Sequence, residues 1–211
     1  MVSLGTDGSG EWQPNSIDCI LEPQSGVGGL YIGSKFAATD QKMLSKLNIT
    51  SVLTVVPELK IPYDLKVFTH KVLPVEDVEI FDISQFFDEA VEFIRENLKT
   101  RNVLVHCWAG TNRSSTILVA YLIAEKKMDV LTAIKYARSK RRIIAGPSPG
   151  FYKQLEAYQK RLAKTATSDG TSIGKAKEVV SATENSTQIK ESETTSISES
   201  NSKEKTFSET K

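Results

Sequence analysis

The sequence has few cysteines, no long apolar run and almost no net charge. Its two cysteines, Cys19 and Cys107, stand far apart without a Cys-x-x-Cys pair or a Cys/His cluster, so neither a disulfide framework nor a zinc site is expected. Lys and Arg number 27 and Asp and Glu 26, a formal net charge of +1, which provides no global field for nucleic acid or a membrane surface. No stretch approaches the roughly 18 apolar residues of a membrane-spanning helix. We therefore expect no metal, no nucleic-acid partner and no membrane attachment.

The composition predicts one folded domain between two flexible ends. A chain of 211 residues is long enough for one domain with a well-buried core. After Lys164 the sequence is rich in Ser, Thr, Glu and Lys and has no aromatic residue until Phe207, so this part buries too little apolar surface to offset its ordering entropy. We predict a flexible N-terminus over 1–14, a domain over 15–164 and a disordered tail over 165–211.

The opening segment MVSLGTDGSGEW has no basic stretch followed by an apolar one, which is the pattern of a secretory signal. We therefore expect a cytoplasmic protein, with the nucleus as a second compartment.

Hydrophobic patterning predicts alternating strands and helices. Short apolar or β-branched runs predict strands at 17–21, 30–32, 49–56, 67–73 and 102–106. Helical periodicity predicts helices from Ser34 to Leu47, then over 82–98, 114–125, 129–140 and 150–163. Asp82 and Gln85 have the spacing of a capping box. The alternation predicts an α/β fold, with a central, mostly parallel twisted sheet of about five strands flanked by helices on both faces.

The chemistry is concentrated in the segment HCWAGTNRSS, residues 106–115. It lies between a predicted buried strand and a helix that is apolar almost all round. A loop in this position directs successive backbone N–H groups at one point, and the helix adds the positive end of its dipole. The segment therefore predicts an anion-binding loop made of Cys107, Trp108, Ala109, Gly110, Thr111, Asn112 and Arg113.

Five residues of this segment have predicted chemical roles. We predict that Cys107 is a nucleophile whose thiolate form is favoured by the loop and by Arg113. The planar fork of Arg113 suits two phosphate oxygens, and Gly110 permits a tight turn around the anion. Ser114 is placed to donate a hydrogen bond to the sulfur, and His106 to orient the loop. A lone cysteine is more often a small buried apolar residue, but Gly, Arg and Ser at these offsets favour catalysis.

These residues resemble the protein tyrosine phosphatase superfamily, whose signature is His-Cys, five residues, then Arg-Ser or Arg-Thr. The segments 29–38, 48–55 and 120–123 are similar to dual-specificity phosphatases, and so is the closing segment 146–155, where Ser148 stands in place of the usual Asn. The resemblance covers about 15–164, and the departure at Ser148 leaves a local turn open.

The family also uses an aspartate, on a loop about thirty residues before the cysteine, as general acid. Asp77 in LPVEDVEIFD fits this position. The alternatives are Glu76, Glu79 and Asp82, and Asp82 is better explained as a helix cap.

The resemblance implies a small, atypical dual-specificity phosphatase that hydrolyses phosphotyrosine and phosphoserine or phosphothreonine through a cysteinyl-phosphate intermediate. It implies phosphoprotein substrates, a protein kinase as one candidate partner, and no cofactor. Two alternatives stay open: the same chemistry on an RNA 5′-triphosphate, a phosphoinositide or a glucan, or a phosphoprotein-binding module. The physiological substrate and the oligomeric state are left open.

Other polar residues have two interpretations each. Arg138, Arg141 and Arg142 form either a secondary anion site or a solvated helix end. Trp108 either lines the pocket mouth or packs on a neighbouring loop. Cys19 is either a structural thiol, which we favour, or a partner for oxidised Cys107. His70 receives no role.

Overall fold

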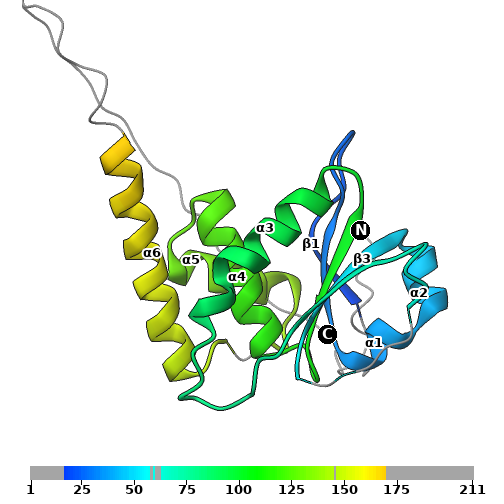
Figure 1. Cartoon of the computed structure of the whole chain (residues 1–211), viewed down its shortest axis with the longest axis horizontal. Helices are drawn as coiled ribbons and strands as arrows, with labels where there is room; N and C mark the ends of the chain where they lie inside the picture. Colours follow the sequence, from blue (N-terminus) through cyan, green and yellow to red (C-terminus); the bar gives the residue numbers. More distant parts are fainter. Residues whose placement is uncertain (1–16, 58, 60–62, 145, 170–211) are drawn as a thin grey trace, which may run out of the picture. The chain divides into compact units, whose positions relative to one another are not determined.

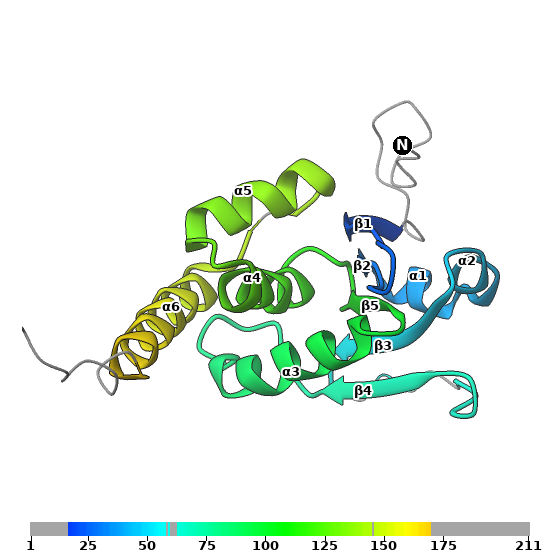
Figure 2. The same cartoon turned by 90° about the horizontal axis from the view of Figure 1, so that it is seen from above.

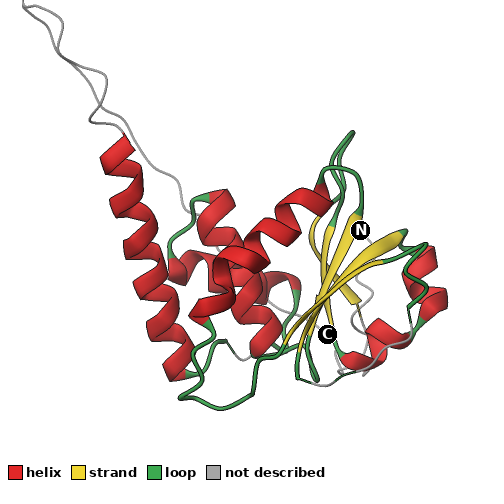
Figure 3. Ribbon diagram, viewed as in Figure 1, coloured by secondary structure: helices red, strands yellow, loops and turns green. Residues whose placement is uncertain are grey.

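The computed structural model describes residues 17–57, 59, 63–144 and 146–169. Its centre is a five-stranded sheet with the order β1-β2-β5-β3-β4 (Figures 1 and 3). β1 pairs antiparallel with β2, whereas the β2–β5, β5–β3 and β3–β4 pairs are parallel. The strands are β1 (Ile17–Leu21), β2 (Leu30–Gly33), β3 (Ile49–Val55), β4 (Thr69–Leu73) and β5 (Asn102–His106).

Helices cover both faces of the sheet (Figure 2). α1 and α2 lie against β2 and β3 on one face, while α3 and α4 pack on β3 and β5 from the other, and α5 and α6 pack on α4. The predicted α/β architecture is confirmed. The helices are α1 (Lys35–Thr39), α2 (Gln41–Lys46), the 3-10 turn η1 (Ser84–Phe86), α3 (Phe87–Leu98), α4 (Arg113–Lys126), α5 (Val130–Lys140) and α6 (Pro149–Asp169).

Strand β5 shows why the sheet needs helices on both sides. Its side chains alternate between the faces. Val103 and Val105 belong to the large core under α3 and α4, whereas Leu104 belongs to the smaller core under α1 and α2. All three side chains are fully buried, so β5 is held from both sides, and the segment that follows it begins at a fixed place.

Helix α4 is the central helix of the larger core. Every residue from Arg113 to Ala124 is buried, as expected for a helix that is apolar almost all round. The helix ends at Lys127, which adopts the left-handed conformation (φ 55°) of a C-cap.

The structure differs from the predicted elements at three helix ends. The helix predicted from Ser34 to Leu47 is two helices, because Asp40 has a non-helical backbone and its carboxylate accepts the Met43 N–H at 3.0 Å as the N-cap of α2. Asp82 does not form the predicted capping box. Its carboxylate instead accepts the Ser84 N–H at 3.1 Å, and a 3-10 turn precedes α3.

The last helix continues to Asp169, beyond the predicted domain end at 164. Thr165 and the residues after it are helical although most of them are polar. Extending a helix that has already formed adds a backbone hydrogen bond for each residue and needs no new nucleus. The predicted flexible N-terminus, 1–14, and the rest of the predicted tail, 170–211, lie outside the described residues.

Within the described ranges, no helix is both long and apolar enough to cross a membrane. The same part of the chain holds no group of three or more His, Cys, Asp and Glu side chains placed to bind a metal ion.

Candidate active site

The predicted anion-binding loop joins β5 to α4, at the carboxyl end of the parallel strands. It turns sharply at Gly110, which has a positive φ of 74°. A Cβ atom at this position would stand 2.5 Å from the carbonyl oxygen of Gly33, at the end of β2. Gly110 is therefore required twice, for its backbone conformation and for the close approach of the loop to β2.

The loop surrounds the thiol of Cys107. Only 2% of Cys107 is exposed, and two donors converge on its sulfur: the backbone N–H of Gly110 and the hydroxyl of Ser114, each at 3.2 Å. Donors aimed at one atom in this way stabilise negative charge that develops there during a reaction. The contact predicted between Ser114 and Cys107 is confirmed.

Arg113 begins α4 and reaches back under the loop. Its side chain is buried, with one terminal N–H donating to the Val75 carbonyl at 3.3 Å and Nη2 lying 3.4 Å from Asp77 Oδ2. Among the described residues Nε has no hydrogen-bond acceptor although it is buried. An unpaired N–H on a buried cation is costly, so the site is one acceptor short, and a phosphate oxygen is the acceptor a guanidinium prefers.

Asp77 stands at the mouth of this site. Its side chain is 46% exposed, against 9% for Arg113, and it accepts a hydrogen bond from the Asn112 side chain at 2.7 Å. Glu76 and Glu79 are exposed, and Asp82 is bonded to Ser84. Within the described residues, Asp77 is thus the one of these four carboxylates that contacts the anion-binding loop, through Asn112 and Arg113.

Asn112 also links the loop to the segment before α6. While its amide nitrogen donates to Asp77, its amide oxygen accepts the Ser148 N–H at 2.9 Å. The turn left open by the sequence at Ser148 is therefore fixed by Asn112, and the Ser148 carbonyl in turn accepts the Tyr152 N–H in the first turn of α6.

His106 lies against the backbone of Cys107. Its Nδ1 lies 3.2 Å from the Cys107 carbonyl, which can only accept, so Nδ1 carries the proton. Burial lowers the pKa of His106 to about 4, so the ring is neutral and Nε2 accepts from the Thr54 hydroxyl at 2.7 Å. These contacts fix the ring beside the Cys107 backbone, and the predicted orienting role of His106 stays a prediction.

This arrangement extends to His70, which the sequence analysis left without a role. Because the Thr54 hydroxyl donates its proton to His106, its oxygen accepts from His70 Nε2 at 2.8 Å. Burial also lowers the pKa of His70. The chain of hydrogen bonds therefore runs from β4 through β3 to His106, the last residue of β5, and it joins three neighbouring strands of the sheet directly before the loop.

Arg141 was wrongly assigned to a secondary anion site. It is only 2% exposed, and it pairs with the carboxylate of Asp18 on β1. Its Nε donates to the Gly110 carbonyl at 3.1 Å and Nη2 to the Ala109 carbonyl at 3.4 Å. A buried charge needs such partners, so Arg141 supports the outer side of the catalytic loop.

The other two residues of that predicted site are exposed. Arg138 is partly engaged, since its Nε donates to the Ile144 carbonyl at 3.1 Å. The predicted secondary anion site therefore loses Arg141, its central residue. Arg142 is exposed, which fits the alternative interpretation of a solvated helix end.

Two further sequence alternatives are settled by contacts. Trp108 is 53% exposed, and its ring lies under the Lys35 ammonium, 3.4 Å from the ring centroid. It therefore packs on the neighbouring segment at Lys35. Burial raises the pKa of Cys19 to about 12, and its thiol donates to the Leu21 carbonyl at 3.3 Å. Cys19 is a neutral structural thiol, as favoured.

Sequence reasoning missed Thr54, His70, Asp18 and the inward role of Arg141. One signal was present: Thr54 and Asp18 are polar residues inside strands predicted to be buried, and a buried polar group needs a partner. The partners themselves are distant in sequence, so the pattern alone does not name them.

Comparison with known proteins agrees with this site. The model of the "dual specificity phosphatase, catalytic domain" family matches residues 30–161. "Dual specificity protein phosphatase 1B" of Arabidopsis thaliana is 41% identical over 139 residues, 65% of this chain and 82% of that protein. "Dual specificity protein phosphatase 1" of the same plant is 40% identical over 135 residues, 64% of this chain and 67% of that protein.

Among solved structures, that of DUSP15 has a TM-score of 0.61 and 30% identity, and the match covers 72% of this chain and 97% of that one. The family match extends from the start of β2 into α6 and includes the whole strand-loop-helix unit around Cys107. The chain therefore belongs to the dual specificity phosphatase family, and residues 30–161 form its catalytic domain.

Proposed function

We propose that this phosphatase hydrolyses phosphotyrosine, phosphoserine and phosphothreonine in proteins through a cysteinyl-phosphate intermediate. Two observations at one site carry the proposal. The buried Cys107 thiol receives two hydrogen bonds, and the buried Nε of Arg113 has no acceptor among the described residues. A phosphoryl group held by the guanidinium and the loop N–H groups supplies that acceptor and places its phosphorus in front of the sulfur.

The chemistry proceeds in two displacements. The Cys107 thiolate attacks phosphorus, a P–S bond forms, and the P–O bond to the substrate breaks while Asp77 gives its proton to the leaving oxygen. A water then attacks the phosphoenzyme and gives its proton to the Asp77 carboxylate, and the P–S bond breaks with the electron pair returning to sulfur. Inorganic phosphate leaves, and both side chains regain their starting protonation states.

Asp77 stands where the leaving oxygen would emerge. Its exposure at the mouth contrasts with the burial of Arg113 and Cys107 below it. The hydrogen bond from Asn112 fixes one carboxylate oxygen, and the other oxygen faces Arg113 across 3.4 Å. When the guanidinium turns to a phosphate, this second oxygen becomes available to the leaving group.

The loop composition favours phosphoprotein over the alternative substrates. Its variable positions, Trp108, Ala109, Thr111 and Asn112, are uncharged, whereas a phosphoinositide headgroup calls for cations near the loop. Asn112, which resembles a residue of RNA triphosphatases, uses both ends of its amide inside the protein. Both ends of this amide therefore hold neighbouring segments of the protein together, which gives Asn112 a structural use apart from any triphosphate chain.

A substrate panel tests this proposal. Phosphotyrosine and phosphoserine peptides, short-chain phosphoinositides, a phosphorylated glucan and triphosphate RNA are assayed for phosphate release with the full chain. We expect turnover of both peptide classes, and its loss in Cys107→Ser and Arg113→Ala. Faster release from a lipid, glucan or RNA substrate would contradict the substrate class, and substantial turnover by Cys107→Ser would contradict the covalent intermediate.

A further inference from the structure

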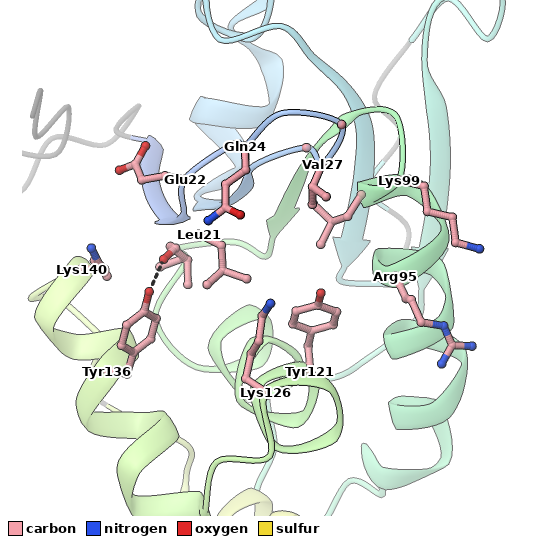
Figure 4. Close-up of a pocket in the computed structure, with 14 residues that line it drawn as sticks. Leu21, Glu22, Gln24, Val27, Arg95, Lys99, Tyr121, Lys126, Tyr136 and Lys140 are labelled. Carbon is pink, nitrogen blue, oxygen red and sulfur yellow. Dashed lines mark hydrogen bonds between the residues drawn. The ribbon is translucent and has the colours of Figure 1, made fainter.

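A cavity of about 510 Å³ lies away from the catalytic loop (Figure 4). It is enclosed by the β1–β2 connection, the carboxyl ends of α3 and α4, and α5. The residues that define its chemistry are Leu21, Val27, Leu98, Tyr121, Lys126 and Lys140.

The strand register places this cavity at the opposite end of the sheet from the active site. Leu30 at the start of β2 pairs with Val103, and Gly33 at its end pairs with His106. The segment before β2 therefore lies at the amino end of β5, while the catalytic loop follows its carboxyl end. Helix α4 spans the distance between them, since its 14 residues extend about 20 Å.

The cavity has an apolar wall. Leu21 at the end of β1 and Val27 in the β1–β2 connection face it (Figure 4). Leu98, the last residue of α3, also lines it. Val27 is 51% exposed, so its side chain is accessible to a molecule in the cavity. This wall suits an aromatic or aliphatic group.

The hydroxyl of Tyr121 points into the cavity without a partner (Figure 4). Tyr121 is only 5% exposed, and its hydroxyl makes no hydrogen bond among the described residues. The neighbouring Tyr136 differs, because its hydroxyl donates to the Ile20 carbonyl at 2.8 Å. Burial raises the pKa of Tyr121 to about 12, so the hydroxyl keeps its proton and has a donor to offer. The hydroxyl is therefore an accessible donor at the cavity wall, which an acceptor group of a ligand can meet.

The charges around the cavity are mostly positive. Its lining includes four cationic side chains and one carboxylate, Glu22. Arg95 and Lys99 are paired with glutamates of α3 and α4, whereas in the described part of the chain Lys126 and Lys140 make no ion pair. Lys126 and Tyr121 both line the cavity (Figure 4), so the cavity offers an anionic group an ammonium and a hydroxyl donor.

We propose that this cavity binds a small organic anion, in which an aromatic or aliphatic body carries one carboxylate, sulfonate or phosphate group. The body lies against Leu21, Val27 and Leu98. The anionic group accepts a hydrogen bond from the Tyr121 hydroxyl and pairs with Lys126. The volume is within the range of about 300–1,000 Å³ typical of small-ligand sites. The site is separate from the phosphatase reaction and does not depend on it.

The probe for this proposal is 8-anilinonaphthalene-1-sulfonate, an aromatic sulfonate whose fluorescence rises in apolar surroundings. The full chain is titrated with the probe in the presence of saturating orthovanadate, which occupies the catalytic loop as a phosphate analogue. We expect saturable binding that vanadate does not displace. Two further arms use the uncharged N-phenyl-1-naphthylamine and inorganic sulfate, and both should bind more weakly because each lacks one half of the ligand.

Three variants assign the binding to this cavity. Lys126→Met should weaken binding about tenfold, the effect of one charged hydrogen-bonded contact, and Tyr121→Phe should weaken it several-fold by removing only the hydroxyl. Lys46→Met, an exposed lysine on α2, is the matched control and should bind like the unmodified chain. Melting curves verify that each variant is folded.

Three results would overturn the proposal. Vanadate displacement would place the probe in the active site. Equal binding by Lys126→Met and Lys46→Met would place it elsewhere on the surface. Equal affinity for the uncharged naphthylamine would show that the cavity selects only apolar groups.

Discussion

The hydroxyl of Ser114 donates a hydrogen bond to the sulfur of Cys107 at 3.2 Å, from the first turn of the helix that follows the loop. In the proposed mechanism this sulfur is the leaving group of the second displacement, when the negative charge returns to it. A donor already in place stabilises that charge.

Ser114→Ala should therefore slow phosphoenzyme breakdown more than its formation. Rapid-mixing kinetics with an aryl phosphate should show a burst of product followed by a slower steady state. Ser115→Ala is the matched control, because the Ser115 hydroxyl donates to the carbonyls of Thr111 and Asn112 and not to the sulfur. A burst of equal size in both variants would argue against the role of Ser114.

Asp77→Asn should reduce the turnover rate most for substrates whose leaving oxygen must be protonated as the P–O bond breaks. For phosphoserine and phosphotyrosine peptides we expect a loss of about 10²–10⁴-fold, the usual contribution of a general acid. An aryl phosphate with an activated leaving group should lose much less.

Glu76→Gln, Glu79→Gln and Asp82→Asn serve as controls for the acid. Asp82→Asn should be mild because Asn can accept the same N–H of Ser84. If any control reproduces the leaving-group dependence while Asp77→Asn does not, Asp77 is not the acid.

Arg141→Met should destabilise the protein and weaken catalysis together. The substitution leaves the Asp18 carboxylate buried without its partner, and breaking one side of a buried pair costs about 3–5 kcal/mol. It also removes the donors to the Gly110 and Ala109 carbonyls. Denaturant unfolding measures the first effect and aryl phosphate turnover the second.

Arg142→Met is the neighbouring control, because Arg142 is exposed and its loss should change stability by less than about 0.5 kcal/mol. Adding Asp18→Asn to Arg141→Met should recover part of the lost stability. Stability that is the same in both single arginine variants would rule out a supporting role for Arg141.

His106 makes the stability of the domain depend on pH. Burial lowers its pKa to about 4, against about 6.5 for histidine in an unfolded chain. Between these values the unfolded chain binds a proton that the folded chain excludes, so stability falls as the pH drops from 6.5 toward 4. Above pH 6.5 this contribution is fully retained, and at pH 4 the loss reaches about 3 kcal/mol.

His106→Asn should accordingly show a smaller drop in melting temperature between pH 7 and pH 4.5 than the unmodified protein. The comparison of the two profiles removes the contribution of the carboxylates, which both proteins share. Parallel profiles would mean that acidification acts through other groups.

The sequence was most informative where one local pattern determines one structure. The alternation along β5, the all-apolar α4 and the glycine at 110 each follow from side chains within a few residues. The same holds for Ser114 and Cys107, which are seven positions apart at the two ends of one short loop. These contacts could be predicted because loop geometry leaves the side chains little choice.

Contacts between distant segments could not be predicted in the same way. Arg141 lies in a basic run at the end of α5 and has the composition of a solvated helix end, yet it is buried because Asp18 on β1 stands opposite it. His70 has no local pattern at all, and its role follows from the pairing of β3 with β4, which aligns it with Val52, close to Thr54 on the same strand. Such roles depend on sheet order, which single segments do not specify.

The burial of helix α4 links the loss of catalytic activity to the unfolding of the domain. Because it has no polar face, it gains little from forming alone in water and is stable only when the sheet and the helices around it are assembled. Its first two residues are Arg113 and Ser114, so the proposed phosphate clamp and the hydroxyl that donates to the Cys107 sulfur are in place only in the assembled domain. Partial unfolding that frees α4 abolishes the active site in the same event, and catalytic activity is therefore a direct measure of cooperative folding in this protein.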